Sequence, residues 1–148
     1  MRRSPMSHRL IRDAIAARKP FVAAAKTTVA DAARIMKKHD VGALMIVDSG
    51  RLTGIFTERD ALFRVIAEAR DPGTTLVAEV MTSKPQTITP DKAVGHALLM
   101  MYEGGFRHVP VVEDGKPVGM VSARDALGPE LDEFQAELLQ REHLREII

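Results

Sequence analysis

The chain has 148 residues, of which 45% are hydrophobic and 28% charged, the composition of an ordinary soluble globular protein. Its 21 basic and 20 acidic side chains leave a net charge of +1, which excludes a global positive field for holding nucleic acid. The absence of cysteine excludes disulfides, thiolate nucleophiles and cysteine-ligated zinc. No apolar run reaches the roughly 18 residues that a membrane-spanning helix needs.

Residues 1–19 form a basic lead-in segment, which we interpret as a short, solvated, amphipathic helix. The alternative is an arm that touches RNA or a membrane surface, but so short a patch supports only weak phosphate contact. The segment lacks the apolar stretch of a secretory signal, and with the absence of cysteine this predicts a cytoplasmic protein. Its charged residues are Arg2, Arg3, Arg9, Arg12, Arg18 and Lys19, against the single acid Asp13.

The chain repeats itself after a shift of 65 residues, without a gap. Chance would give about 3 identities over the repeated stretch at average residue frequencies. The repeat therefore predicts two copies of one structural unit. The identical pairs are Pro20/Pro85, Val29/Val94, Ala32/Ala97, Met36/Met101, Val47/Val112, Gly50/Gly115, Gly54/Gly119, Arg59/Arg124, Asp60/Asp125, Ala61/Ala126 and Leu62/Leu127.

The first repeat predicts an extended piece, a helix, two strands and a second helix. After the extended residues 21–23, apolar residues recur at helical spacing from Val29 to Met36. Strands over 43–47 and 52–56 flank a turn at 48–50, and a helix runs from Glu58 through residue 69. Residues 71–73, Asp-Pro-Gly, end that helix, and a short helix near 76–81 leads into the second repeat.

The second repeat predicts the same order of elements. Residues 86–88 are extended, and Thr89 with Pro90 predicts the start of a helix that stops at 104–105, Gly-Gly. Strands over 109–112 and 117–121 flank an Asp-Gly turn, and a helix begins at Ala123. Residues 129–148 predict a further amphipathic helix, either a cap on the fold or part of a dimer contact.

These elements predict an α+β protein of two β-α-β-β-α repeats, packed sheet to sheet with pseudo-twofold symmetry. A single unit of this size cannot cover both faces of its sheet, whereas two copies can cover each other. The predicted organisation is a lead-in helix over 1–19, the first repeat over 20–70, a linker with a short helix over 71–79, the second repeat over 80–128, and a C-terminal helix over 129–148.

A motif of glycine, two apolar residues, a hydroxyl residue, two more residues and aspartate occurs where a strand meets a helix in each repeat. It places Thr57 before Asp60 and Ser122 before Asp125. One interpretation is a helix cap, in which hydroxyl and carboxylate form a capping box. The other is a ligand site, because a glycine within a strand often marks close approach of a ligand or another backbone.

Arg107 and His108 precede the strand beside the second motif, and they favour a nucleotide site there. A carboxylate accepts hydrogen bonds from sugar hydroxyls, while arginine and histidine can hold a phosphate. A helix start also offers free N–H groups to an anion. With an apolar slot between strands for the base, these groups describe a nucleotide.

The tandem repeat, the paired Gly-x-x-Thr/Ser-x-x-Asp motifs, the Val-Met-Thr lead-in at 80–82 and the Arg-His-Val-Pro-Val strand at 107–111 resemble the CBS-domain family over about residues 20–127. The resemblance implies a Bateman module with two clefts that bind AMP, ADP or ATP, or S-adenosyl-methionine, and a homodimer. It implies no required cofactor, metal or catalytic residue. The implied site residues are Val22, Ala23, Ala43, Thr57, Arg59 and Asp60, and Thr87, Ile88, Arg107, His108, Val109, Pro110, Ser122, Arg124 and Asp125.

The first repeat departs from this pattern, because Gly42 and Ala43 stand where the second repeat has Arg107 and His108. The cleft around Asp125 is therefore predicted to be the better nucleotide site. We expect a regulatory module that signals to an unknown partner by conformational or dimer-interface change. The alternatives are a ligand-free dimerisation module and a nucleic-acid-associated accessory protein.

Overall fold

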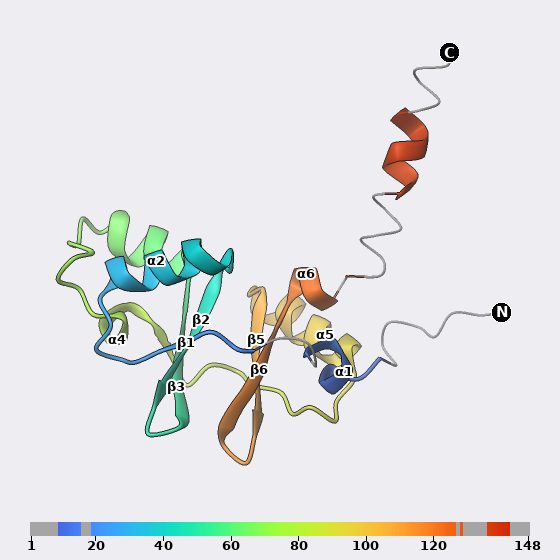
Figure 1. Ribbon diagram of the computed structural model, residues 1–148, viewed down its shortest axis with the longest axis horizontal. Helices are drawn as coiled ribbons and strands as arrows, with labels where there is room; N and C mark the ends of the chain where they lie inside the picture. The colour runs from blue at the N-terminus through green and yellow to red at the C-terminus, as the bar shows by residue number, and fades with distance from the viewer. Residues whose placement is uncertain (1–8, 16–18, 127, 129–135, 143–148) are drawn as a thin grey trace.

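The computed structural model describes residues 9–15, 19–126, 128 and 136–142. Two halves lie side by side, each built around an antiparallel hairpin with helices beside it (Figure 1). The first hairpin is β2 (Ala43–Asp48) with β3 (Arg51–Thr57), and the second is β5 (His108–Glu113) with β6 (Lys116–Ser122). Strands β3 and β6 contact each other across the boundary between the halves. The predicted α+β class is confirmed.

The first sheet has four strands in the order β1-β2-β3-β4. The short strand β1 (Val22–Ala23) is parallel to β2, and β4 (Thr82–Ser83) is antiparallel to β3. In the second half the predicted extended segment pairs only through an isolated parallel bridge between Ile88 and Val111. The two halves thus share one plan but differ in how much of it forms regular ladder.

Both hairpins turn through two residues, as the sequence predicts. Asp48 pairs with Arg51, and Glu113 pairs with Lys116. The four residues between these pairs all have φ between 52° and 78°. Positive φ at both central positions defines the type I′ turn, whose twist matches that of the strands and which glycine and aspartate tolerate. Each hairpin also has a register shift at the same place, after Ile46 and after Val111.

The two long helices are α2 (Val29–His39) and α5 (Val94–Gly104). Thr28 caps α2, because its side chain accepts a hydrogen bond from the N–H of Asp31 at 3.1 Å. The predicted cap of α5 at Thr89 is wrong, since α5 begins four residues after Pro90. Residues 89–93 instead form a turn whose carbonyls accept N–H groups from residues 11 and 12.

Two short helices that precede the repeats pack into opposite halves. Helix α1 (Ile11–Ile15) places the fully buried Ile11 in the core of the second half, beside Val94. Helix α4 (Val77–Val80) places both of its valines in the core of the first half. The segment before each repeat therefore completes the core of the other one. The lead-in helix is more than a solvated surface element, although its Arg12 and Asp13 are exposed.

The glycines inside the two strands are explained by this packing. A Cβ on Gly54 would overlap the sulfur of Met81 and lie 2.9 Å from the Thr82 carbonyl oxygen. A Cβ on Gly119 would lie 2.8 Å from Cδ1 of Ile15. Of the two interpretations offered by a strand glycine, close approach of another protein segment is the one observed.

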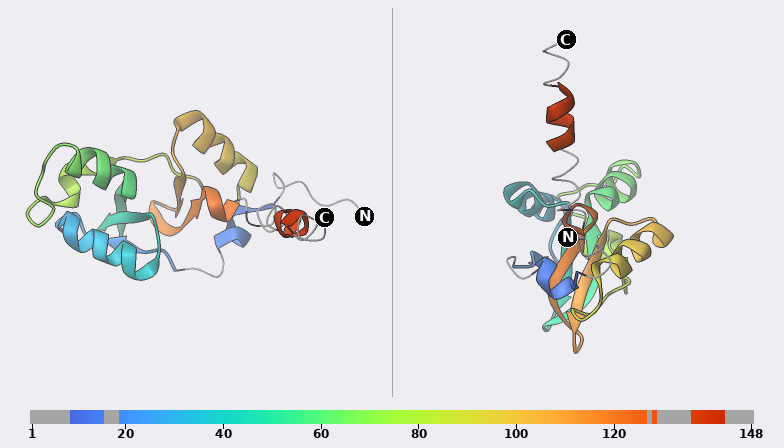
Figure 2. Two further views of the ribbon diagram at one scale, coloured as in Figure 1. Left: turned by 90° about the horizontal axis from the view of Figure 1, so that it is seen from above. Right: turned by 90° about the vertical axis from the view of Figure 1, so that its right-hand side faces the viewer.

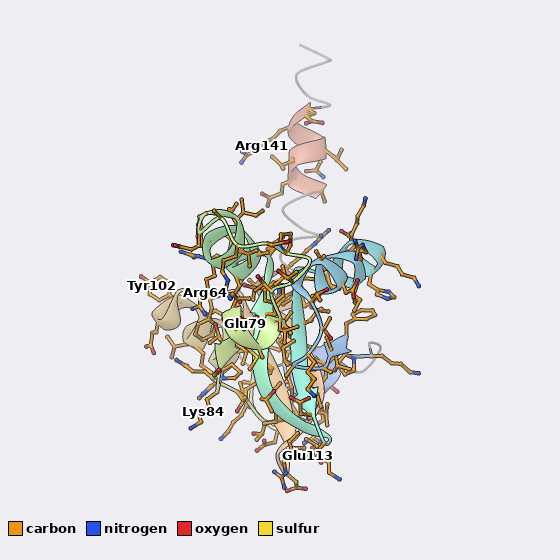
Figure 3. All side chains as sticks on the ribbon, turned by 90° about the vertical axis from the view of Figure 1, so that its left-hand side faces the viewer. Arg64, Glu79, Lys84, Tyr102, Glu113 and Arg141 are labelled. Atoms are coloured by element: carbon orange, nitrogen blue, oxygen red, sulfur yellow. The ribbon has the colours of Figure 1, made fainter. Side chains whose placement is uncertain are left out.

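The helix after β3 is not one regular α-helix. It starts as α3 (Glu58–Asp60) and continues as the π-helix η2 (Ala61–Ile66), short of the predicted end at residue 69. Arg64 on η2 donates to the carbonyls of Val80 and Met81 at 3.2 and 3.1 Å, which ties η2 to α4. Figure 3 shows Arg64 close to Glu79 on this side of the molecule.

The helix after β6 is α6 (Ala123–Ala126). Residues 136–142 are also helical and exposed, and Figures 1 and 2 show them away from both hairpins. Of the predicted apolar stripe of the C-terminal helix, only Leu138 lies within the described residues. Residues 1–8 of the lead-in segment are likewise outside them. Among the described residues, no helix is long and apolar enough to cross a membrane.

Candidate functional site

A pocket of about 870 Å³, here called the seam pocket, opens between the two halves beside the start of α6. The first half contributes the residues before β1, the end of α2 and the start of α3. The second half contributes the start of β5 and the junction of β6 with α6. Its lining residues are Ile15, Lys19, Pro20, Phe21, His39, Asp40, Val41, Gly42, Ala43, Glu58, Arg107, His108, Met120, Ser122, Ala123, Arg124 and Asp125.

The wall that carries Asp125 is fixed at both ends of α6. At the start of the helix, the Asp125 N–H donates to Oγ of Ser122 at 3.0 Å. At the end, the Arg9 guanidinium donates to the carbonyls of Asp125 and Ala126 at 3.3 and 3.0 Å. Arg9 belongs to the lead-in segment, so the exchange of short helices also holds this wall in place.

The corresponding aspartate of the first repeat has a different environment. Asp60 is 7% exposed and forms a complete capping box with Thr57, with bonds of 3.0 and 3.2 Å. Its second carboxylate oxygen lies 3.6 Å from Nε of Arg64. Neither Thr57 nor Asp60 lines the seam pocket. The helix-cap interpretation of the motif therefore describes the first repeat.

Charges of both signs line the seam pocket. The cations are Lys19, Arg107 and Arg124, and the carboxylates are Asp40, Glu58 and Asp125. His108 lies among them, and burial lowers its pKa below the usual 6.5. Glu58 and Asp125 act in the opposite direction, and Arg107 lowers the pKa further. Neutral imidazole is thus favoured over imidazolium while the pocket holds no anion.

This shift predicts how stability depends on pH. Because the folded pKa of His108 is below that of the unfolded chain, the unfolded state binds the proton more readily. The contribution of His108 is therefore full above pH 6.5 and is lost as pH falls through the folded pKa. Urea unfolding of the wild type and His108→Gln between pH 7.5 and 5.5 should show a larger loss for the wild type. A difference that stays constant over this range, or the same change in the exposed-histidine variant His96→Gln, would contradict the assignment.

The seam pocket brings together six of the residues that the sequence singled out, and it leaves nine outside its lining. Those inside come from β2 and from the second repeat's strand and helix starts. Those outside include the whole first-repeat motif and both extended segments. The residues inside are Ala43, Arg107, His108, Ser122, Arg124 and Asp125, and those outside are Val22, Ala23, Thr57, Arg59, Asp60, Thr87, Ile88, Val109 and Pro110.

Three contributors to the pocket were not expected from the sequence. Phe21 and His39 stack with ring centroids 4.3 Å apart. Glu58 lies so close to Gly42 that a Cβ there would be 3.1 Å from its Oε1 and 3.5 Å from Cε1 of His108. The 65-residue alignment holds a signal for Glu58, because its counterpart is the uncharged Ala123. Among the described residues, no group of three acidic or histidine side chains could hold a metal ion.

Comparisons with known proteins agree with this architecture. The model of the family described as CBS domain matches residues 11–67 and 77–128. A mitochondrial CBS domain-containing protein of Arabidopsis thaliana is 39% identical over 116 residues, which are 75% of this chain and 56% of the relative. The chain thus spans about half the length of that relative.

Two solved structures are similar over most of the chain. A CBS-domain protein of Pyrobaculum aerophilum, solved with AMP, is 26% identical with a TM-score of 0.72, covering 78% of this chain and 88% of the other. The CBS-domain pair of protein MJ0100, solved with methylthioadenosine and S-adenosyl-L-methionine, is 30% identical with a TM-score of 0.73, covering 84% and 97%. The chain therefore belongs to the CBS-domain family, and it contains two copies of the domain.

Proposed function

We propose that this CBS-domain pair is a regulatory module that binds an adenosine-containing ligand in the seam pocket, and that it acts in the cytoplasm as a homodimer on a partner protein. The observation that carries the proposal is the position of Asp125, a carboxylate on a fixed helix start in the wall of a pocket shared by both halves. A ligand that bridges the two halves would favour one arrangement of them over others. No pocket residue is assigned a catalytic role.

The chemistry of the lining suits such a ligand. Asp125 would accept hydrogen bonds from the ribose hydroxyls, which a carboxylate does well. Arg107, His108 and Arg124 would face the phosphate. Apolar side chains of the lining, such as Val41 and Met120, would cover the base. The related structures with AMP, or with methylthioadenosine and S-adenosyl-L-methionine, support an adenosine ligand.

The proposal is tested by titrating AMP, ATP and S-adenosyl-methionine into the chain by calorimetry. We expect at least one to bind, and Asp125→Ala to weaken that binding about tenfold or more, because a charged acceptor of ligand hydrogen bonds is lost. The matched control is Asp60→Asn in the first repeat, which should leave the affinity unchanged. Equal binding by wild type and Asp125→Ala would refute the role of Asp125.

A ligand-free dimerisation module is the second candidate, and exposed apolar side chains favour it. Leu62, Phe63 and Ile66 on η2 are 50%, 51% and 67% exposed. Tyr102 on α5 is 87% exposed and points away from the fold in Figure 3. Patches of this kind often mark protein contacts. Thermal unfolding separates the candidates, since no stabilisation by any of the three adenosine compounds at millimolar concentration would favour this one.

A further inference from the structure

The boundary between the halves carries a charge asymmetry that their shared backbone does not require. The Glu58 N–H donates to the Gly42 carbonyl at 3.0 Å, and 65 residues later the Ala123 N–H donates to the Arg107 carbonyl at 2.8 Å. The first half combines the smallest residue with an acid, and the second combines a small residue with a cation. The same local structure therefore presents a carboxylate from one side and a guanidinium from the other.

The acid lies at the end of the pocket where the cations are. Because a Cβ on Gly42 would contact both Oε1 of Glu58 and Cε1 of His108, the carboxylate and the imidazole lie on either side of one glycine. Glu58 also acts electrostatically on His108. An anionic group that reaches His108 and Arg107 consequently meets Glu58 as well.

The charge of the lining limits how much anion it can hold. Lys19, Arg107 and Arg124 are balanced by three carboxylates, of which Glu58 comes from the first half. AMP carries about two negative charges and ATP about four. The further phosphates of ATP would bring charge toward Glu58, and like charges at such a site disfavour binding.

Building on the proposed function, we propose that Glu58 is a specificity-determining residue that restricts the seam pocket to adenosine ligands of low negative charge. The pocket binds a nucleoside monophosphate in preference to the triphosphate. Gly42 permits this arrangement, because it leaves room for the carboxylate beside His108.

Calorimetry with AMP and ATP in magnesium-free buffer tests the proposal on the full chain. The wild type should bind AMP more tightly than ATP. Glu58→Gln keeps the shape of the side chain and should strengthen ATP binding about three- to tenfold, while AMP binding changes less than about twofold. Glu113→Gln, at the tip of the second hairpin and outside the pocket lining, removes the same charge and should change neither (Figure 3).

The outcomes separate this inference from the proposal on which it rests. An unchanged ratio of ATP to AMP affinity in Glu58→Gln, or an equal change in Glu113→Gln, overturns the role of Glu58. If AMP binding is lost in Asp125→Ala while Glu58→Gln leaves the ratio unchanged, only the specificity inference fails. If wild type and Glu58→Gln bind neither nucleotide, the proposed function and this inference fail together.

Discussion

Replacing Ile11 with alanine is expected to lower the free energy of unfolding by about 2–5 kcal/mol, the usual cost of truncating a buried aliphatic side chain to alanine. Ile11 is fully buried in the core of the second half, although it stands well before the first repeat in the chain. The truncation would leave a cavity between α1 and α5, on which the neighbouring Arg9 contacts to α6 also depend. Urea unfolding measures the change.

The matched control is Ile66→Ala on η2, which removes the same atoms from a side chain that is 67% exposed. It should change stability by less than about 0.5 kcal/mol in the monomer. Equal losses in the two variants would show that α1 is not part of the core.

Gly54→Val is expected to cost about 1–3 kcal/mol, or more if the strands separate. Valine is a better strand former than glycine, so an open site would be stabilised by this change. Here the new Cβ would overlap the Met81 sulfur and approach the Thr82 carbonyl oxygen to 2.9 Å. The methionine can move, whereas the carbonyl belongs to the paired strand β4 and cannot move without breaking the ladder.

Urea unfolding of Gly54→Val is compared with that of Gly128→Val, because no heavy atom lies within 4 Å of a Cβ at residue 128. The control should remain close to the wild type. A stabilised Gly54→Val would mean that β3 and β4 are not closely packed.

The parts of the fold that the sequence predicts are those set by local chemistry. Asp-Gly turns favour positive φ and so specify the two-residue hairpins. The helical spacing from Val29 to Met36 specifies α2, and all three of its buried residues lie on that predicted face. The 65-residue repeat then transfers the same plan to the second half.

The parts that it does not predict depend on contacts between distant segments. Thr89 and Pro90 have the chemistry of a helix start, but their turn instead supplies carbonyls to α1, about 80 residues earlier. The exchange of α1 and α4 has no local signal, since either helix has an apolar side that any core could bury. The π-helical turn η2 likewise differs little in sequence from an α-helix.

The candidate site follows the same division. The motif with Asp125 and the neighbouring Arg107 and His108 were expected near a ligand, and they line one pocket. The pairing of Phe21 with His39 was not expected, because it depends on how β1 and the end of α2 meet in space. Asp60 carries the same motif as Asp125, yet the nearby Arg64 and its own capping box satisfy it.

The exchange of α1 and α4 has a consequence for how the molecule can be divided. Cutting the chain in the 71–73 loop would separate Val77 and Val80 from the core they fill, and would leave Ile11 on a fragment that has no place for it. The duplicated halves are therefore interlocked and behave as one cooperative folding unit, so that neither half is expected to be stable when expressed alone.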